Sequence, residues 1–174
     1  MTRRHLSKPL LAAILLTWLT SALPAATIIL VRHADRAAAM SADALLSPAG
    51  EERATLLAQV LKDSAIGRIY VTEVRRTQQT AAPIAARLHL TPIVIPQSDT
   101  DALIGQLRKL GENETALVVG HANTVPLIVE RLGAGPVPAM PDSEYDRLTV
   151  VFIPAGGKPH ALTLRYGAVR GKTI

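Results

Sequence analysis

Hydrophobic residues along this chain gather in short runs that alternate with longer segments of mixed polar and apolar residues. Runs rich in β-branched residues predict six strands, at 27–32, 68–72, 92–96, 115–120, 148–153 and 161–165. The run at 27–32 is continuous rather than alternating, which is typical of a strand that is buried on both faces of a sheet.

The segments between these runs carry the signals of helices. The clearest start is Ser47, a hydroxyl residue suited to capping, which is followed by Pro48 and by Glu51 in the first turn. Apolar residues then recur on one helical face, at Leu56, Leu57, Val60 and Leu61, before Gly67 ends the unit. Further helices are predicted at 74–88, 99–110 and 123–132. Because strands alternate with helices, the fold class is α/β with a largely parallel sheet.

The beginning of the chain differs from the rest. Three basic residues precede an apolar segment at 10–23, and small residues follow it. This order is typical of a secretory signal peptide, and the apolar segment is shorter than the roughly 20 residues of a membrane span. We expect a signal peptide at 1–26 that is cleaved after Ala25 or Ala26, and an exported, periplasmic domain at 27–174. The alternative is an uncleaved leader that anchors the chain to the inner membrane.

Composition narrows the possible function classes. The 174 residues include no cysteine, which excludes disulfides, thiolate metal sites and a cysteine nucleophile. The formal net charge of +5 suggests nucleic-acid binding, but three of the 19 basic residues lie in the leader, which has no acidic residue. The remaining 16 basic and 14 acidic residues nearly balance, and no basic cluster is interleaved with aromatic residues. We therefore expect no nucleic-acid partner.

Two histidines, His33 and His121, each directly follow a predicted buried strand. Since ligands of open α/β sheets bind at the carboxyl ends of the strands, both imidazoles are expected at one edge of the sheet. Arg32 lies beside His33 and Arg76 comes just after the second predicted strand, and both supply permanently charged donors suited to phosphate oxygens. A neutral histidine can attack phosphorus, although a single histidine after a strand is more often a structural residue.

Four motifs occur together in a fixed order, namely RHADR at 32–36, LSPAG at 46–50, TEVRRTQQT at 72–80 and VGHAN at 119–123. In these motifs the chain resembles the histidine phosphatase superfamily, whose members are also called phosphoglycerate mutase-like. The resemblance implies a three-layer α/β/α fold with a mostly parallel central sheet. Ala122 stands where the acid phosphatase and phytase branch has an aspartate, so the chain is identified as a small exported bacterial member of the mutase-like branch.

The resemblance also implies roles for individual residues. His33 corresponds to the family nucleophile, which becomes a phosphohistidine, and Arg32 and Arg76 correspond to its phosphate-binding arginines. His121 corresponds to the second histidine, which stabilises the phosphoryl group in flight. Thr72 stands where the family usually has serine, and it could donate a hydroxyl to the pocket.

Three further residues near these motifs lie outside the central four. Arg36 could contact the phosphorylated substrate or pair with a surface acid. Arg75 is interpreted as an exposed helix residue, because neighbouring residues on a helix diverge by about 100°. Asn123 is interpreted as a helix cap that bonds the backbone.

The general acid that protonates the leaving oxygen is less clearly marked. The mutase-like branch has a glutamate after the helix of the second arginine, and here that stretch offers Asp99 and Asp101. Either could serve as the acid, and either could instead cap the following helix. Asp35 and Glu73 lie near the motifs and are weaker candidates.

Together these residues predict a phosphomonoesterase that uses no metal and no cofactor and forms a phosphohistidine on His33. The expected substrate is a phosphorylated small molecule or a cell-envelope glycan. Two alternatives stay open, a phosphohistidine protein phosphatase and a phosphate-binding protein of the same fold with little or no turnover. Contact with a membrane is expected only through an uncleaved leader.

Overall fold

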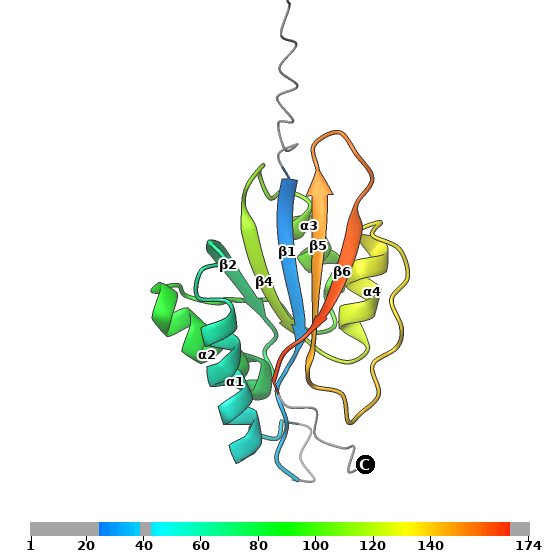
Figure 1. The fold of residues 1–174 in the computed structure, drawn as a ribbon. Coiled ribbons are helices and arrows are strands. Elements are labelled where there is room, and N and C mark those ends of the chain that lie inside the picture. Colours follow the sequence, from blue (N-terminus) through cyan, green and yellow to red (C-terminus); the bar gives the residue numbers. More distant parts are fainter. Residues whose placement is uncertain (1–24, 39–42, 168–174) are drawn as a thin grey trace, which may run out of the picture.

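A computed structural model describes residues 25–38 and 43–167, and within this part the chain forms six strands and four helices (Figure 1). In chain order they are β1 (Ala25–Arg32), α1 (Pro48–Val60), β2 (Ile66–Val71), α2 (Arg75–Leu88), β3 (Ile93–Val94), α3 (Thr100–Leu107), β4 (Thr115–Gly120), α4 (Thr124–Arg131), β5 (Arg147–Pro154) and β6 (His160–Arg165). Strands and helices alternate up to α4, as the hydrophobic pattern predicts.

The strands join one mixed sheet in the order β3-β2-β4-β1-β5-β6. The first four in this order are parallel, whereas β5 runs antiparallel to β1, and β6 runs antiparallel to β5. Thr27 pairs with Thr115 and Arg32 pairs with Gly120, so that β1 and β4 end level with each other. The predicted α/β fold with a mostly parallel central sheet is confirmed.

Helices cover both faces of this sheet, with α1 and α2 on one face and α3 and α4 on the other (Figure 1). Strand β1 supplies both interfaces. Ile29 and Val31 pack in the cluster with α1 and α2, and Ile28 and Leu30 pack in the cluster with α3 and α4. Alternate residues of β1 therefore enter opposite cores, which explains why its hydrophobic run is continuous.

Two predicted boundaries move for reasons of backbone chemistry. Strand β3 is limited to Ile93–Val94 instead of 92–96, because the prolines at both ends of the run cannot donate a hydrogen bond to a neighbouring strand. Gly67, which was expected to end the preceding helical unit, lies inside β2. The pairing of β2 with β4 shifts register between Ile66 and Arg68, and glycine tolerates such an irregularity.

The first described residue, Ala25, already belongs to β1, two residues before the predicted start of the strand. It pairs with Pro154 of β5, and its carbonyl accepts a hydrogen bond from the Asn113 N–H. The rest of the expected signal peptide, 1–24, lies outside the described residues, so its cleavage stays a prediction. No helix within 25–38 and 43–167 is long and apolar enough to cross a membrane.

The reversed direction of β5 brings a further loop to the carboxyl edge of the parallel strands. β5 starts beside the end of β1, because Leu148 pairs with Val31. The segment 141–146, which leads into β5, therefore lies at the edge where β1 and β4 end. This edge is the lower end of the sheet in Figure 1.

Candidate active site

The carboxyl ends of three neighbouring strands bring two imidazoles and a hydroxyl together. His33 follows β1, His121 follows β4 and Thr72 follows β2, and all three side chains are buried. The two imidazole ring centroids lie 5.4 Å apart, with an angle of 65° between the ring planes. The sheet thus places both predicted histidines at one edge, as their positions after the strands indicated.

The ring of His33 is held in one orientation. Its Nδ1 lies 2.9 Å from the carbonyl oxygen of Ala34, and since a carbonyl can only accept, Nδ1 carries the proton. The His33 N–H donates to Gly120 O, and the Ala34 N–H donates to the Thr80 hydroxyl, both at 2.9 Å. These bonds fix the backbone around the ring and leave the lone pair of Nε2 available for chemistry.

The electrostatic surroundings keep His33 neutral. Burial is the largest influence and lowers its pKa to about 3. The hydrogen bond to the Ala34 carbonyl is the second-largest influence and acts in the opposite direction, while the positive charges of Arg76 and Arg32, and His121, lower the pKa further. At neutral pH the imidazole is therefore uncharged, with its one proton on Nδ1 and a lone pair on Nε2. An uncharged imidazole is the form that can act as a nucleophile.

His121 is also neutral, and its two nitrogens have different partners. Burial lowers its pKa to about 4, helped by the charges of Arg76 and Arg32, while the charge of Glu73 acts in the opposite direction. Nδ1 lies 3.4 Å from Nη2 of Arg76, and because guanidinium can only donate, Nδ1 accepts. Nε2 then carries the proton and donates to the Thr72 hydroxyl at 3.1 Å.

Arg32 is almost fully buried, and its guanidinium is held by the segment before β5. Nη1 donates to the carbonyl oxygens of Pro141, Asp142 and Glu144 at 3.0, 3.0 and 3.1 Å. The ring of Tyr145 lies against the same guanidinium, 4.3 Å from ring centroid to Cζ. The buried Nε of Arg32 has no hydrogen-bond partner among the described residues.

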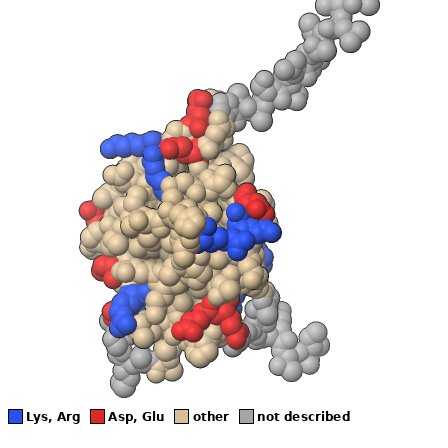
Figure 2. Space-filling model, turned by 90° about the vertical axis from the view of Figure 1, so that its left-hand side faces the viewer, with Lys and Arg blue, Asp and Glu red and all other residues tan. Residues whose placement is uncertain are grey.

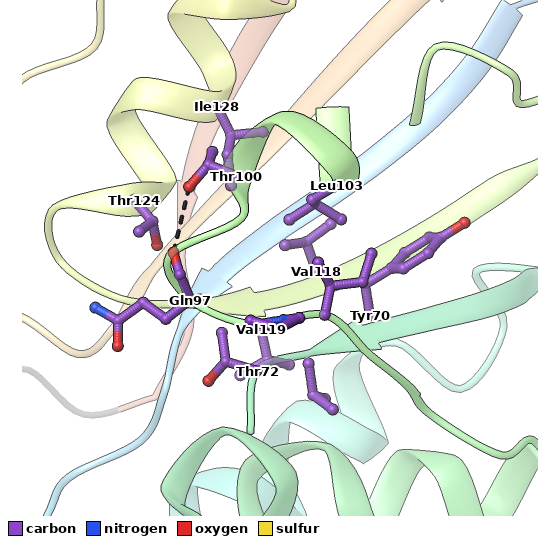
Figure 3. A pocket seen from close by; sticks show the side chains of 13 residues that line it. Tyr70, Thr72, Gln97, Thr100, Leu103, Val118, Val119, Thr124 and Ile128 are labelled. Carbon is purple, nitrogen blue, oxygen red and sulfur yellow. Dashed lines mark hydrogen bonds between the residues drawn. The ribbon is translucent and has the colours of Figure 1, made fainter. Parts of the chain in front are cut away.

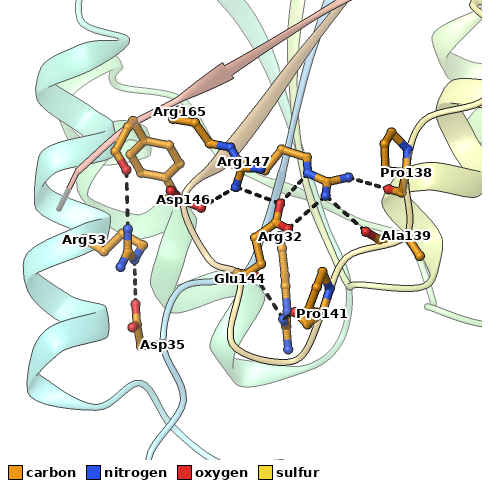
Figure 4. A network of polar contacts seen from close by, with 11 residues as sticks. Arg32, Asp35, Arg53, Pro138, Ala139, Pro141, Glu144, Asp146, Arg147 and Arg165 are labelled. Atoms are coloured by element: carbon orange, nitrogen blue, oxygen red, sulfur yellow. Dashed lines mark hydrogen bonds and ion pairs between the residues drawn. The ribbon is translucent and has the colours of Figure 1, made fainter. Parts of the chain in front are cut away.

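A network of ion pairs fixes this segment, as Figure 4 shows. The Arg147 guanidinium contacts both carboxylate oxygens of Glu144, one of them from Nη2 at 2.9 Å, and donates to the carbonyl oxygens of Pro138 and Ala139. Nη1 of Arg165 adds a contact of 2.9 Å to Glu144. Arg147 is 5% exposed and Glu144 is 13% exposed, so water screens the pair of Arg147 and Glu144 little. The network therefore determines where the carbonyls that hold Arg32 lie.

The motif at 72–80 positions Arg76 through buried hydroxyls. Arg76 lies in the first turn of α2. The Thr77 hydroxyl accepts the Thr72 N–H at 3.2 Å, and the Thr80 hydroxyl donates to the Arg76 carbonyl at 2.7 Å while it accepts the Ala34 N–H. The spacing of these threonines thus joins the start of α2 to the residue that follows His33.

The motif at 46–50 holds the loop after His33 against the start of α1. The Ser47 hydroxyl accepts the Gly50 N–H as a helix cap and donates to the Asp35 carbonyl, both at 3.2 Å. Gly50 approaches Asp35 so closely that a Cβ would collide with the Asp35 carbonyl oxygen. The Leu46 N–H donates to the side-chain oxygen of Gln79 at 3.0 Å, which connects this motif to α2.

The carboxylates expected to be the general acid are bound elsewhere. Asp99 caps α3 and accepts the Ala102 N–H at 3.0 Å. Asp101 forms an ion pair with Arg131, the last residue of α4 and about 10 Å along that helix from its first residue. Asp35, a weaker candidate, is paired with Arg53 Nε at 2.6 Å. The structure thus favours the capping role for Asp99 and a surface ion pair for Asp101.

The structure also places the three further residues near the motifs, namely Arg36, Arg75 and Asn123. Arg36 is exposed, and after burial its positive charge is the largest influence that lowers the pKa of Arg76, so it lies near that guanidinium. Arg75 is exposed, in agreement with its interpretation as a surface residue. Asn123 makes no capping bond from its side chain; instead the Thr124 hydroxyl accepts the His121 N–H at 3.0 Å. Asn123 is thus the N-cap residue of α4, as interpreted, but the expectation that its side chain bonds the backbone is wrong.

Tyr145 contributes to the site although it belongs to none of the four motifs. Its ring centroid lies 6.0 Å from that of His33, and the ring contacts Arg32. Interaction with Tyr145 also raises the pKa of Arg76 against the overall lowering. Tyr145 therefore lies beside three of the four central residues.

A small apolar hollow lies next to Thr72, between the segment 95–100 and α4 (Figure 3). Ile95, Leu103 and Ile128 supply apolar walls, and its volume of about 20 Å³ is enough for one water-sized group. On the face of the molecule in Figure 2, basic and acidic side chains are interspersed and form no broad basic surface. Within 25–38 and 43–167, no three His, Asp or Glu side chains gather as a candidate metal site.

This arrangement combines a neutral imidazole, a second neutral imidazole and fixed guanidinium groups in a largely buried place. Guanidinium groups bind tetrahedral oxyanions well, because they offer several donors and a permanent charge. The charges that lower the pKa values of the histidines are those of the same arginines. Chemically, the site is suited to receive a phosphoryl group on His33.

Comparison with known proteins shows which family model and which solved structures this chain is similar to. Residues 28–98 match the family model described as Histidine phosphatase superfamily (branch 1). The solved structure of the protein histidine phosphatase SixA complexed with tungstate is 22% identical, with a TM-score of 0.66 over 80% of this chain and 96% of that chain. The alpha-ribazole phosphatase from Shigella flexneri is 16% identical, with a TM-score of 0.64 over 82% and 96%. No curated protein sequence matches this chain.

The phosphoglycerate mutase from Plasmodium falciparum is also similar in structure, at 18% identity and a TM-score of 0.58 over 87% of this chain and 96% of that chain. At such identities the likeness concerns the fold, which is phosphoglycerate mutase-like. The matched stretch at 28–98 includes Arg32, His33 and Arg76, whereas His121 lies beyond it. The sheet, rather than the matched sequence, brings His121 into the site.

Proposed function

We propose that this chain, which carries a histidine phosphatase superfamily domain, hydrolyses phosphate monoesters through a phosphohistidine on His33. The observation that carries the proposal is the state of His33: its side chain is buried and neutral, its Nδ1 is bound to the Ala34 carbonyl, and its Nε2 has no hydrogen-bond partner within 25–38 and 43–167. Arg32, Arg76 and His121 lie near this ring, and the two arginines supply permanently charged donors for a phosphoryl group. The combination supports group transfer to His33 better than a structural role, which would give both ring nitrogens a partner.

In the first step the lone pair of His33 Nε2 attacks phosphorus, and the bond between phosphorus and the ester oxygen breaks. The leaving oxygen keeps the electron pair of that bond and takes a proton from an acid. In the second step water attacks the phosphohistidine, the P–N bond returns its electrons to Nε2, and the proton of the water passes to a base. The products are an alcohol and inorganic phosphate, so atoms and charges balance.

The arginines act on the transferring group. Phosphoryl transfer involves little covalent chemistry by the protein, so catalysis depends on positioning and on stabilising the charge of the equatorial oxygens. Arg32 cannot reorient freely, because three carbonyls and Tyr145 hold it. Such prior fixation reduces the reorganisation needed when the phosphoryl group arrives.

For the substrate we propose a phosphorylated small molecule or a cell-envelope glycan that meets the enzyme after export. A second candidate, a protein carrying phosphohistidine, is favoured by the likeness to the SixA structure, which is that of a protein histidine phosphatase. The two candidates use the same chemistry at His33 and differ in the leaving nitrogen or oxygen. A panel of sugar phosphates and a phosphohistidine protein, assayed side by side, distinguishes them by kcat/KM.

The test of the proposed function is hydrolysis of p-nitrophenyl phosphate by the purified protein. His33→Ala is expected to lower kcat by about 1,000-fold or more, as removal of a catalytic nucleophile does. His160→Gln serves as the control, because His160 is exposed on β6. Undiminished turnover by His33→Ala would overturn the proposal. A wild-type protein that binds vanadate without any turnover would replace it by a phosphate-binding function.

A further inference from the structure

The proposed mechanism leaves one group without an assignment, namely the acid that protonates the leaving oxygen. The inference below rests on the proposed function. Asp35, Asp99 and Asp101 already have other partners: Arg53, the start of α3 and Arg131. A carboxyl group that serves as the acid must instead lie beside the two histidines and keep one oxygen accessible.

Glu73 lies at this edge of the sheet. It directly follows Thr72, whose hydroxyl contacts Nε2 of His121 at 3.1 Å. Its negative charge is the main influence that raises the pKa of His121 against the overall lowering, so the carboxylate is within electrostatic reach of that ring. The Gln78 side chain donates to the Glu73 carbonyl at 2.9 Å and fixes the backbone.

The carboxylate of Glu73 is held by one oxygen only. Oε2 accepts the backbone N–H of Gln97 at 2.8 Å, from the segment that leads into α3. Among the described residues Oε1 has no hydrogen-bond or ion-pair partner, and the side chain is exposed. The side chain is thus tethered at the edge of the site with one oxygen available for proton transfer.

The order of strands places Glu73 on the side where a leaving group is expected. In-line displacement puts the nucleophile and the leaving oxygen on opposite sides of phosphorus. His33 follows β1, which lies on one side of β4, and Glu73 comes after β2 on the other side. Two strand spacings span about 10 Å. An in-line array needs roughly 7 Å, since the attacking nitrogen starts about 3 Å from phosphorus, the hydrogen bond to the acid adds nearly 3 Å, and the bond from phosphorus to the leaving oxygen makes up the rest.

Another exposed carboxylate near the arginines lies on the wrong side. Asp142 is 3.9 Å from Nη2 of Arg32 and belongs to the segment before β5. It is therefore next to the strand that carries the nucleophile, rather than across from it. Glu144 is enclosed in the network with Arg147 and Arg165.

We propose that Glu73 is the acid–base residue of the reaction. Its protonated carboxyl gives the proton to the leaving oxygen as the bond to phosphorus breaks. The resulting carboxylate then takes a proton from the water that attacks the phosphohistidine on His33, which restores the starting state. No further reactant is needed.

The experiment measures the phosphorylation step with two substrates that differ in leaving group. Dinitrophenolate leaves without a proton, whereas an alkyl oxygen, as in glycerol phosphate, needs one. Glu73→Gln keeps the shape of the side chain but cannot donate a carboxyl proton. It is expected to slow single-turnover cleavage of the alkyl ester by about 100-fold or more, and cleavage of dinitrophenyl phosphate by only a few-fold.

Asp99→Asn and Asp101→Asn are matched controls, and both are expected to keep wild-type ratios between the two substrates. A merely structural role of Glu73, as the tether of Gln97, would slow both substrates equally, and that result overturns the proposal. An undiminished rate with the alkyl ester, or leaving-group dependence in Asp99→Asn instead, overturns it as well. Failure of the proposed function looks different, because His33→Ala would then cleave dinitrophenyl phosphate at the wild-type rate.

Discussion

The two buried histidines make the stability of this domain depend on pH. In the folded protein the pKa of His33 is lowered to about 3 and that of His121 to about 4, mainly by burial. In the unfolded chain both rings return to a pKa of about 6.5. Between the folded and unfolded pKa values the unfolded state binds more protons than the folded state. The free energy of unfolding therefore falls as the pH falls.

The size of the effect follows from these pKa values. At about pH 5 an unfolded histidine is almost fully protonated, whereas both folded rings are still neutral. Since pH 5 lies about 1.5 units below the unfolded pKa, protonation of each unfolded histidine lowers the free energy of unfolding by about 2 kcal/mol. Both together account for about 4 kcal/mol, which is a large part of the total stability of a typical domain. The loss begins near the unfolded pKa and continues down to the folded pKa values.

The perturbation is His33→Asn, which keeps a donor for the Ala34 carbonyl but removes the titration. Urea unfolding at about pH 7 and about pH 5 gives the loss of stability for each protein. The variant is expected to lose about 2 kcal/mol less than the wild type, while His160→Gln, at an exposed position, loses as much as the wild type. Equal losses in His33→Asn and the wild type would refute the reasoning that burial keeps His33 neutral.

Further predictions concern the surroundings of the site. Gly50→Ala should lower the free energy of unfolding by about 1–3 kcal/mol in urea titrations, since its Cβ would meet the Asp35 carbonyl; unchanged stability would contradict that contact. Tyr145→Ala should weaken vanadate inhibition by about 3- to 10-fold through loss of the ring on Arg32, whereas Tyr145→Phe should not; equal losses would argue against the ring contact. Arg147→Lys should cost about 3 kcal/mol in thermal or urea unfolding, because lysine cannot replace the buried forked contacts, and a stable variant would speak against the network.

The sequence allowed the fold and the central histidines to be predicted because both depend on local patterns. The continuous run of β1 indicated burial on both faces, and parallel strands share one carboxyl edge, so His33 and His121 had to approach each other. The motif at 72–80 likewise contains its own positioning groups, since Thr77 and Thr80 bond within a few residues of Arg76. Short-range hydrogen bonds of this kind leave a recognisable spacing.

Residues that act across long distances in the chain could not be predicted in the same way. Glu144 is 112 residues from Arg32, whose guanidinium its carbonyl binds, and no local pattern connects the two. Tyr145 belongs to the same segment, and its role arises only because β5 runs antiparallel to β1. For Asp99 the sequence pattern fitted two roles, because a carboxylate just before a helix can be a catalytic acid or a helix cap. Only the hydrogen bond from the Ala102 N–H, seen in the structure, distinguishes the cap from the acid.

Trapping of the covalent intermediate is the sharpest test of whether the reaction passes through a phosphohistidine on His33. The protein is mixed with a phosphate monoester, quenched in base within milliseconds to seconds, digested and analysed by mass spectrometry for phosphohistidine. A phosphoryl group is expected on His33; it forms and decays at rates compatible with turnover and is absent from His33→Ala. Phosphorylation of another residue, or steady turnover without any phosphohistidine on His33, would contradict the proposed mechanism.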